Sequence, residues 1–210
     1  MFTSFDFKFP PIPDSVFEVN KAFVQAVKDN DLEKVQAYCK EKQNKRSYEE
    51  ACISAVSNYN LVVFTLLVTS YKKQHDALGI HMVPDYIMGC DALDILIYYL
   101  QAYELSRVDL IKGSIEYQGS YQKFPVKCLN YILSTVDFNE EVDVCNSLLY
   151  RDLSRKLQFY SDTYHDNADF LELCKTSYKL ALHSANNSVY SLEKYMHSNS
   201  DFVSKHLSEL

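Results

Sequence analysis

The sequence predicts an all-α protein built from stacked antiparallel helix pairs, and three observations lead to this fold class. Residues that break helices are confined to three zones, because the four glycines and five prolines all lie in 10–13, 79–89 and 113–125. Elsewhere apolar residues recur every three or four positions, which is the period of a helix buried on one face. The third observation is internal repetition, since a segment near residue 30 returns 29 positions later.

The repeated segment reads as a helix, a short Asp/Asn turn and a second helix. The first copy is VKDNDLEKVQAYCKE (27–41) and the second is VSNYNLVVFTLLVTS (56–70), so that Leu32 aligns with Leu61. One helix pair cannot bury its apolar face alone, and repeated pairs stack to form a common core. We therefore expect two antiparallel pairs over 17–72, with Leu32 and Leu61 in equivalent buried positions. Leu61→Asp should then unfold the N-terminal half.

Further helices are predicted downstream. The segment DALDILIYYLQAYEL (91–105) is apolar nearly all round, which indicates a central, buried helix with Asp91 as its N-cap. In FPVKCLNYILSTV (124–136), Pro125 stands at the first helical position, where proline is favoured. From Asn139 onward a single apolar stripe includes Leu149, Leu153 and Leu157.

We expect these helices to form one continuous domain. Residues 1–15 are an extended segment, because prolines keep the Phe-rich FTSFDFKFPPIP from becoming helical. Residues 16–72 hold the two helix pairs, 73–90 form a connecting loop, and 91–210 are helical with a further repeat copy at 178–197. The Phe-rich segment either packs over the open end of the first pair or docks elsewhere as a detachable peptide.

Composition and charge exclude several classes of function. The formal net charge is -7 and we identify no basic run anywhere in the chain, which argues against binding the nucleic-acid backbone. No apolar run could span a membrane and no secretory signal opens the chain, so we expect a soluble, cytoplasmic protein. The six cysteines have no paired or metal-ligand spacing, so we expect reduced thiols, no metal site and no cofactor.

The duplicated pair resembles the helical half of the ankyrin repeat, whose helices read roughly LHLAAxxGHLEVVKLLL. The resemblance covers 21–41 and 50–70, with Asn30 and Tyr59 standing where the family has its turn glycine. It lacks the family's Thr-Pro-Leu-His, which EACI replaces in the second copy, and the 29-residue offset leaves no room for a β-hairpin finger. An irregular helical bundle is the alternative fold.

The resemblance implies a module that binds a protein partner and has no enzymatic activity. An ankyrin-like protein would grip its partner with the exposed residues of the first helix in each pair. In this sequence those residues are Gln25, Lys28, Ser54 and Ser57. The Asn-, Lys- and Tyr-leaning composition also looks like that of host-directed effectors of intracellular bacteria, several of which carry ankyrin repeats. A host cytoplasm is therefore an expected location.

One catalytic alternative stays open at Cys90. This cysteine follows a glycine at the expected start of a buried helix, and so resembles the nucleophile position of papain-like and ovarian-tumour-type thiol hydrolases. The dipole at a helix N-terminus lowers a thiol pKa, although the adjacent Asp91 acts in the opposite direction and no aromatic residue follows the cysteine. The base would have to be His81, His165 or His183. The competing interpretation is an unreactive residue at a helix start.

Overall fold

The all-α fold class is confirmed in the structure, a computed structural model. Every secondary-structure element of the described residues is a helix. The chain divides into two compact units, 1–83 and 84–210, within the segment that the sequence assigns to a connecting loop. The described residues are 18–75, 83–103, 107–116, 124–135, 144–160, 163–164 and 166–186.

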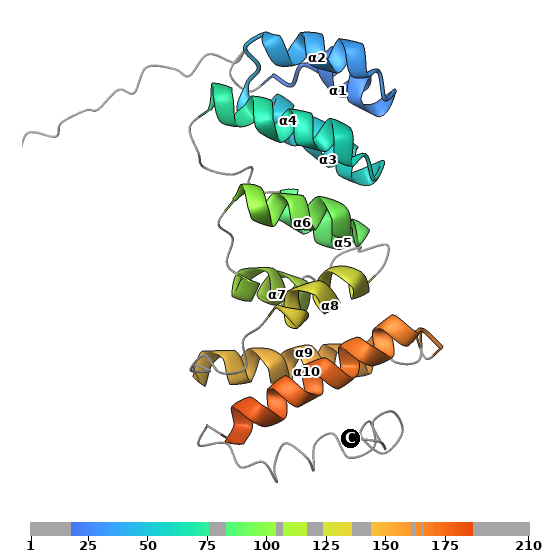
Figure 1. Cartoon of the computed structure of the whole chain (residues 1–210), viewed down its shortest axis with the longest axis vertical. Coiled ribbons are helices and arrows are strands. Elements are labelled where there is room, and N and C mark those ends of the chain that lie inside the picture. The colour runs from blue at the N-terminus through green and yellow to red at the C-terminus, as the bar shows by residue number, and fades with distance from the viewer. Residues whose placement is uncertain are drawn as a thin grey trace, which may run out of the picture. The chain divides into compact units, whose positions relative to one another are not determined.

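The first unit contains the two antiparallel helix pairs that the repeat predicts. Helix α1 (Lys21–Lys28) packs against α2 (Leu32–Lys40), and α3 (Lys45–Ser57) packs against α4 (Leu61–Gln74). The pairs also stack, because α1 lies against α3 and α2 against α4 (Figure 1). Large side chains from all four helices are completely buried between them; these include Phe23, Val35, Tyr48, Phe64 and Leu67.

The predicted burial of Leu32 and Leu61 is wrong. These residues are equivalent, since each is the first residue of the second helix in its pair, but they are 38% and 36% exposed. At this point the first helix of the pair has just ended, so it offers little surface to cover them. The buried equivalents lie one turn further along, at Val35 and Phe64, which are fully buried.

Three turns of the chain share one backbone geometry. Asn30, Tyr59 and Asp91 have positive φ angles of 56°, 52° and 53°. The N–H of each donates to the carbonyl three residues back, and the next N–H donates to the carbonyl five residues back, at 2.9–3.1 Å. These bonds form a Schellman motif, in which one left-handed residue ends a helix. The ankyrin-like turn position at Asn30 and Tyr59 thus has the left-handed conformation that glycine usually adopts.

The third of these turns belongs to a helix pair that the sequence did not predict. It joins α5 (Val83–Cys90) to α6 (Leu93–Ala102), so that residues 83–90 form a helix where a loop was predicted. Leu96 is buried in the position equivalent to Phe64. The further copy predicted at 178–197 stays a prediction: its first residues belong to α10 (Ala168–Asn186), and 187–197 lie outside the described residues.

The second unit continues with longer helices. Besides α5, α6 and α10 it contains α7 (Arg107–Glu116), α8 (Val126–Ser134) and α9 (Val144–Tyr160). Helix α10 packs against α9 and α8, α7 against α9, and α6 against α8. Pro125 occupies the N-cap position of α8, and Asn139 lies outside the described residues. The predicted apolar stripes are buried, namely Val126, Leu129, Ile132 and Leu133 on α8 and Leu149, Leu153 and Leu157 on α9.

Asp91 is not the N-cap of α6, as the sequence predicted. Ala92 holds that position and makes no side-chain hydrogen bond to the helix. The Asp91 carboxylate instead accepts the backbone N–H groups of Lys127 at 3.2 Å and Cys128 at 2.9 Å. Asp91 therefore has a local role, as the left-handed residue of its turn, and a long-range role, as the cap of α8.

Candidate functional site

Three of the four predicted binding residues lie on the exposed side of the first helices. Gln25 and Lys28 on α1 and Ser57 on α3 are exposed. Ser54 is only 8% exposed, so its predicted place on the surface is wrong. Its short side chain folds back onto its own helix, where the hydroxyl donates to the Glu50 carbonyl at 2.9 Å. The equivalent Gln25 is long enough to extend from the helix.

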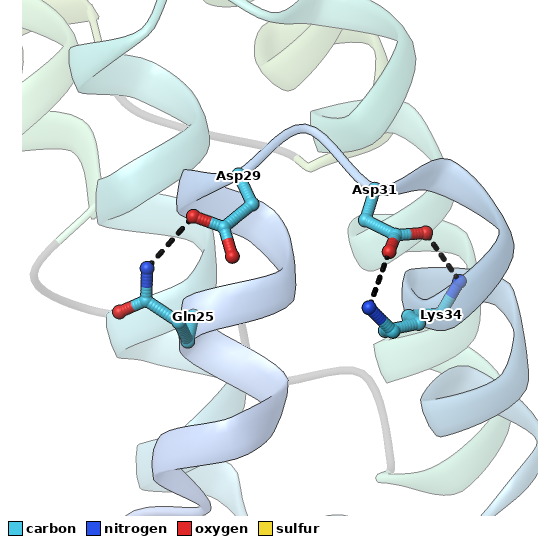
Figure 2. A network of polar contacts seen from close by, with 4 residues as sticks. All are labelled: Gln25, Asp29, Asp31 and Lys34. Atoms are coloured by element: carbon cyan, nitrogen blue, oxygen red, sulfur yellow. Dashed lines mark hydrogen bonds and ion pairs between the residues drawn. The ribbon is translucent and has the colours of Figure 1, made fainter.

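The predicted residues adjoin one end of the helix pairs, which we call the turn end (residues 28–34 and 57–63). In Figure 2, Asp29 and Asp31 flank the reversal between α1 and α2. The Gln25 amide donates to Asp29 at 2.8 Å, and Asp31 accepts from the Lys34 N–H at 3.1 Å and pairs with its ammonium at 2.7 Å. The Lys34 ammonium lowers the pKa of the Asp31 carboxyl, and the Asp31 carboxylate raises the pKa of Lys34.

The two turns of the turn end lie next to each other and expose apolar side chains. The Asn60 side-chain amide donates to the Asn30 side-chain oxygen at 2.5 Å, which links neighbouring pairs. Tyr59 is 60% exposed in its left-handed conformation. All large exposed apolar residues among the described part of the first unit are found here, namely Leu32, Tyr59, Leu61 and Val62.

The opposite end of the first unit, which we call the loop end (residues 18–21, 39–47 and 70–75), has a different construction. Side chains hold the short connection between α2 and α3 in place. The Gln74 amide donates to the carbonyls of Cys39 at 2.8 Å and Glu41 at 2.9 Å, and its oxygen accepts the Gln43 N–H at 3.0 Å. The His75 ring donates from Nε2 to the Gln43 carbonyl at 2.8 Å.

The start of α1 is bound to the same frame. The Asn20 N–H donates to the Ser47 hydroxyl at 2.8 Å, and the Asn20 amide donates to the Gln43 side-chain oxygen at 2.9 Å. The Asn44 amide donates to the Glu18 carbonyl at 2.6 Å. The N-terminal ends of α1 and α3 are therefore held side by side.

A buried hydroxyl pair supports the frame from inside. The Ser70 hydroxyl donates to the Cys39 carbonyl at 2.9 Å, so the Tyr48 hydroxyl, 2.7 Å away, donates to Ser70. Burial raises the pKa of Tyr48 to about 12 and also raises the pKa of the Cys39 thiol. Both groups stay protonated near neutral pH, so this cluster supports the fold and is poorly suited to act as an acid or base.

The loop end carries a concentration of cations that was not predicted from the sequence. Seven exposed side chains lie there, while the only carboxylates in the same residue ranges are Glu18 and Glu41. The signal was present in the sequence, since four of the seven residues in 40–46 are Lys or Arg. This signal was hard to recognise because Glu41 lies among these cations and because the full set of cations comes from three separate segments of the chain. The seven residues are Lys21, Lys40, Lys42, Lys45, Arg46, Lys72 and Lys73.

Cys90 does not lie at a helix start, and the sequence interpretation of its position is wrong. It is the last residue of α5 and is half-buried. The negative end of the helix dipole is found there and disfavours a thiolate, in contrast to the predicted N-terminal position. The side chains of His81, His165 and His183 lie outside the described part of the chain.

Other sources of chemistry are few in the described ranges. Cys52, Cys128 and Cys174 are buried thiols, and burial raises the pKa of each. Among the residues that the structure describes, no three His, Cys, Asp or Glu side chains gather where they could hold a metal ion. In those same ranges, no helix has the length and apolar character needed to cross a bilayer.

Comparison with known proteins assigns no family to the chain. No family model, no curated protein and no solved structure matches it. The ankyrin resemblance therefore rests on the sequence of the two helix pairs and stays a prediction.

Proposed function

We propose that this chain is a protein-binding module of helical-repeat type, which holds a protein partner and catalyses no reaction. The observation that carries the proposal is the contrast between a constant scaffold and a varied surface. Three helix pairs repeat one turn geometry and bury the equivalent positions Val35, Phe64 and Leu96. A repeated scaffold with different exposed side chains is typical of helical-repeat binding proteins.

The variation appears at equivalent positions of the first helix and its turn. The left-handed turn residue is Asn30, Tyr59 or Asp91 in the three pairs. Two positions earlier stand Lys28, Ser57 and Gly89, and three before these stand Gln25, Ser54 and Tyr86. Because these exchanges leave the turn unchanged, the surface is free to suit a partner.

The ankyrin resemblance supports a partner on the first helices of the pairs. Gln25, Lys28 and Ser57 are the exposed residues there that the sequence indicated. Tyr86, which is 41% exposed, is the equivalent of Gln25 in the third pair and was not predicted from the sequence. The likeness in composition to host-directed effectors supports a cytoplasmic location for this activity.

Affinity capture with matched variants tests the proposal. The site variant is Gln25→Arg with Ser57→Arg, and the control is Gln36→Arg with Val62→Arg on the second helices. All four positions are exposed, so both variants should fold. We expect a partner that the wild type and the control capture and the site variant loses, as quantified by mass spectrometry. A partner bound equally by all three proteins would place the contact elsewhere.

The thiol-hydrolase alternative gives the opposing outcome. If Cys90 were a nucleophile, the wild type would hydrolyse a peptide or ubiquitin-derived substrate and Cys90→Ser would not. Iodoacetamide would then label Cys90 ahead of the other described cysteines near neutral pH. We expect no turnover and slow labelling, because Cys90 is half-buried at a helix C-terminus.

A further inference from the structure

The charge of the chain is unevenly distributed, and the loop end of the first unit departs from its acidic character. Seven cationic and two anionic side chains lie in 18–21, 39–47 and 70–75, which gives a formal charge of +5. The whole chain carries -7, so all other residues together carry -12. Including Glu49 and Glu50 in the next turn of α3 still leaves +3. A local positive surface on an acidic protein is a place where an anionic partner is attracted and oriented.

The cations project from a backbone that is held in place. Lys40, Lys42 and Lys45 belong to or flank the connection that Gln74, Asn20 and His75 fix through hydrogen bonds. No ion pair joins Lys40, Lys42, Lys45 or Arg46 to a carboxylate within the described residues. These four charges are therefore available to a partner, and the frame keeps their spacing constant.

Part of this charge is placed where it opposes the stability of the helices. Lys45 and Arg46 occupy the first turn of α3 and Lys21 begins α1, and neither first turn contains an acidic residue. The positive end of a helix dipole favours anions, so cations at these positions cost stability. The Asn20 and Asn44 side chains accept the N–H groups of Phe23 and Ser47, so the caps of both helices are in place and the Lys and Arg side chains are left to meet an anion. Binding of an anionic group explains this arrangement where folding does not.

We propose that the loop end is a docking surface for an acidic, Asp- and Glu-rich segment of a protein partner. This inference rests on the proposed function as a protein-binding module and gives that module a second surface, away from Gln25 and Ser57. Nucleic acid fits less well, because Glu18 and Glu41 interrupt the cations and the rest of the chain repels a polyanion. A membrane fits less well, because the large exposed apolar residues described in this unit all lie at the turn end.

A direct binding assay on the full chain tests this surface. The probe is a short fluorescein-labelled peptide of alternating Glu and Gly, and its Gln counterpart is the uncharged control. The site variant is Lys42→Glu, Lys45→Glu and Arg46→Glu. The matched control is Lys112→Glu, Lys127→Glu and Lys179→Glu, three exposed lysines of the second unit. Both variants have the same net charge, so a difference between them reports position and not overall charge.

We expect the Glu peptide to bind at low salt and to bind more weakly as salt rises. The site variant should weaken binding at least about tenfold and the control less than about twofold. A Lys→Gln version of the site variant, which avoids new charges, should show the same loss if the Glu version unfolds. Three results would overturn the proposal: equal weakening by both variants, equal binding of the Gln peptide, or tighter binding of an oligonucleotide or of phosphatidylserine vesicles. The capture experiment uses other residues and another readout, so the two proposals can fail separately.

Discussion

The two ends of the helix pairs in the first unit are held together in different ways. At the turn end the chain reverses through one left-handed residue, and backbone bonds that reach at most five residues back close the turn. At the loop end the connection between α2 and α3 is fixed by side chains that are 23 to 35 positions away in the chain, such as Asn20 and Gln74.

This difference shows which residues determine the structure of each end. A turn that is closed by its own backbone accepts Asn30 or Tyr59 at the same position, so its sequence can drift while its shape stays. A loop held by distant side chains depends on each of them, because a lost partner leaves a carbonyl or N–H unsatisfied. Substitutions should therefore be costly in the core and at the loop end, and mild at the turn itself.

The largest effect is expected at Phe64, which directly follows the turn end and is buried in the core. Phe64→Ala should lower the free energy of unfolding by about 3–5 kcal/mol, because it leaves a cavity between the two pairs. Leu61→Ala, three residues earlier, should cost about 1 kcal/mol or less since Leu61 is partly exposed. Leu61→Asp should likewise leave the unit folded. Urea unfolding followed by circular dichroism measures all three, and equal costs would contradict the assigned burial.

A second large effect is expected at Asp91, whose backbone closes a turn and whose side chain fixes a distant segment of the chain. Asp91→Ala loses the tolerance for positive φ and the cap of α8, and should cost about 2–3 kcal/mol. Asp91→Gly keeps the turn and loses only the cap, so about 1 kcal/mol is expected. If the two variants are equally unstable, the backbone conformation contributes nothing at this turn.

The separation along the chain of the interacting residues explains which parts of the fold could be predicted from the sequence. Apolar periodicity and helix breakers are local signals, so the two pairs of the first unit and the buried stripes of α8 and α9 followed from them. The third pair was not predicted because its turn residue, Asp91, lies 32 residues after Tyr59, while Asn30 and Tyr59 are 29 residues apart. Asp91 was assigned to the following helix because aspartate is also a common N-cap, and its true partner is 36 positions away.

The candidate surfaces show the same limit. Exposure of Gln25, Lys28 and Ser57 followed from the helix pattern, whereas the burial of Ser54 depends on how its hydroxyl turns back to Glu50. The cations of the loop end come from three separate segments, and only folding brings them together. The net charge of the whole chain does not reveal these cations, because the rest of the chain is more acidic than they are basic.

At the loop end, Gln74→Ala should have an intermediate effect. Removing the amide breaks its bonds to Cys39, Glu41 and Gln43, and we expect a loss of about 2 kcal/mol in the free energy of unfolding. The matched control is Gln36→Ala on the exposed face of α2, which should change it by less than about 0.5 kcal/mol. Chemical denaturation again provides the measurement. A Gln74 variant as stable as the control would show that the loop does not depend on distant side chains.

A smaller effect at neutral pH, with a signature at high pH, is expected for Tyr48→Phe. Loss of the buried hydrogen bond to Ser70 should cost about 1 kcal/mol. Burial raises the pKa of Tyr48 from 10.0 to about 12, so its contribution is complete below pH 10 and is lost as the pH rises toward 12. The stability of Tyr48→Phe should fall less steeply over that interval. Some slope remains, because burial also raises the pKa of the Cys52 thiol. An unchanged slope would mean that the phenol ionises equally well in the folded protein.

The smallest effect, and the only gain, is expected at the turn itself. Tyr59 holds a positive φ of 52°, which a bulky side chain adopts at a cost, while Asn30 holds the same conformation in the neighbouring pair with a residue that tolerates it. Because Tyr59 is 60% exposed, little burial is lost on replacing it. Tyr59→Asn should therefore raise the free energy of unfolding by about 0.5–1 kcal/mol. Tyr86→Asn, at an exposed tyrosine inside α5, should give no gain, because its backbone is already helical. A gain at Tyr59 alone would show that the turn geometry is the repeated feature and its side chain is free to vary. A loss would show that the Tyr59 ring makes contacts that outweigh its unfavourable backbone.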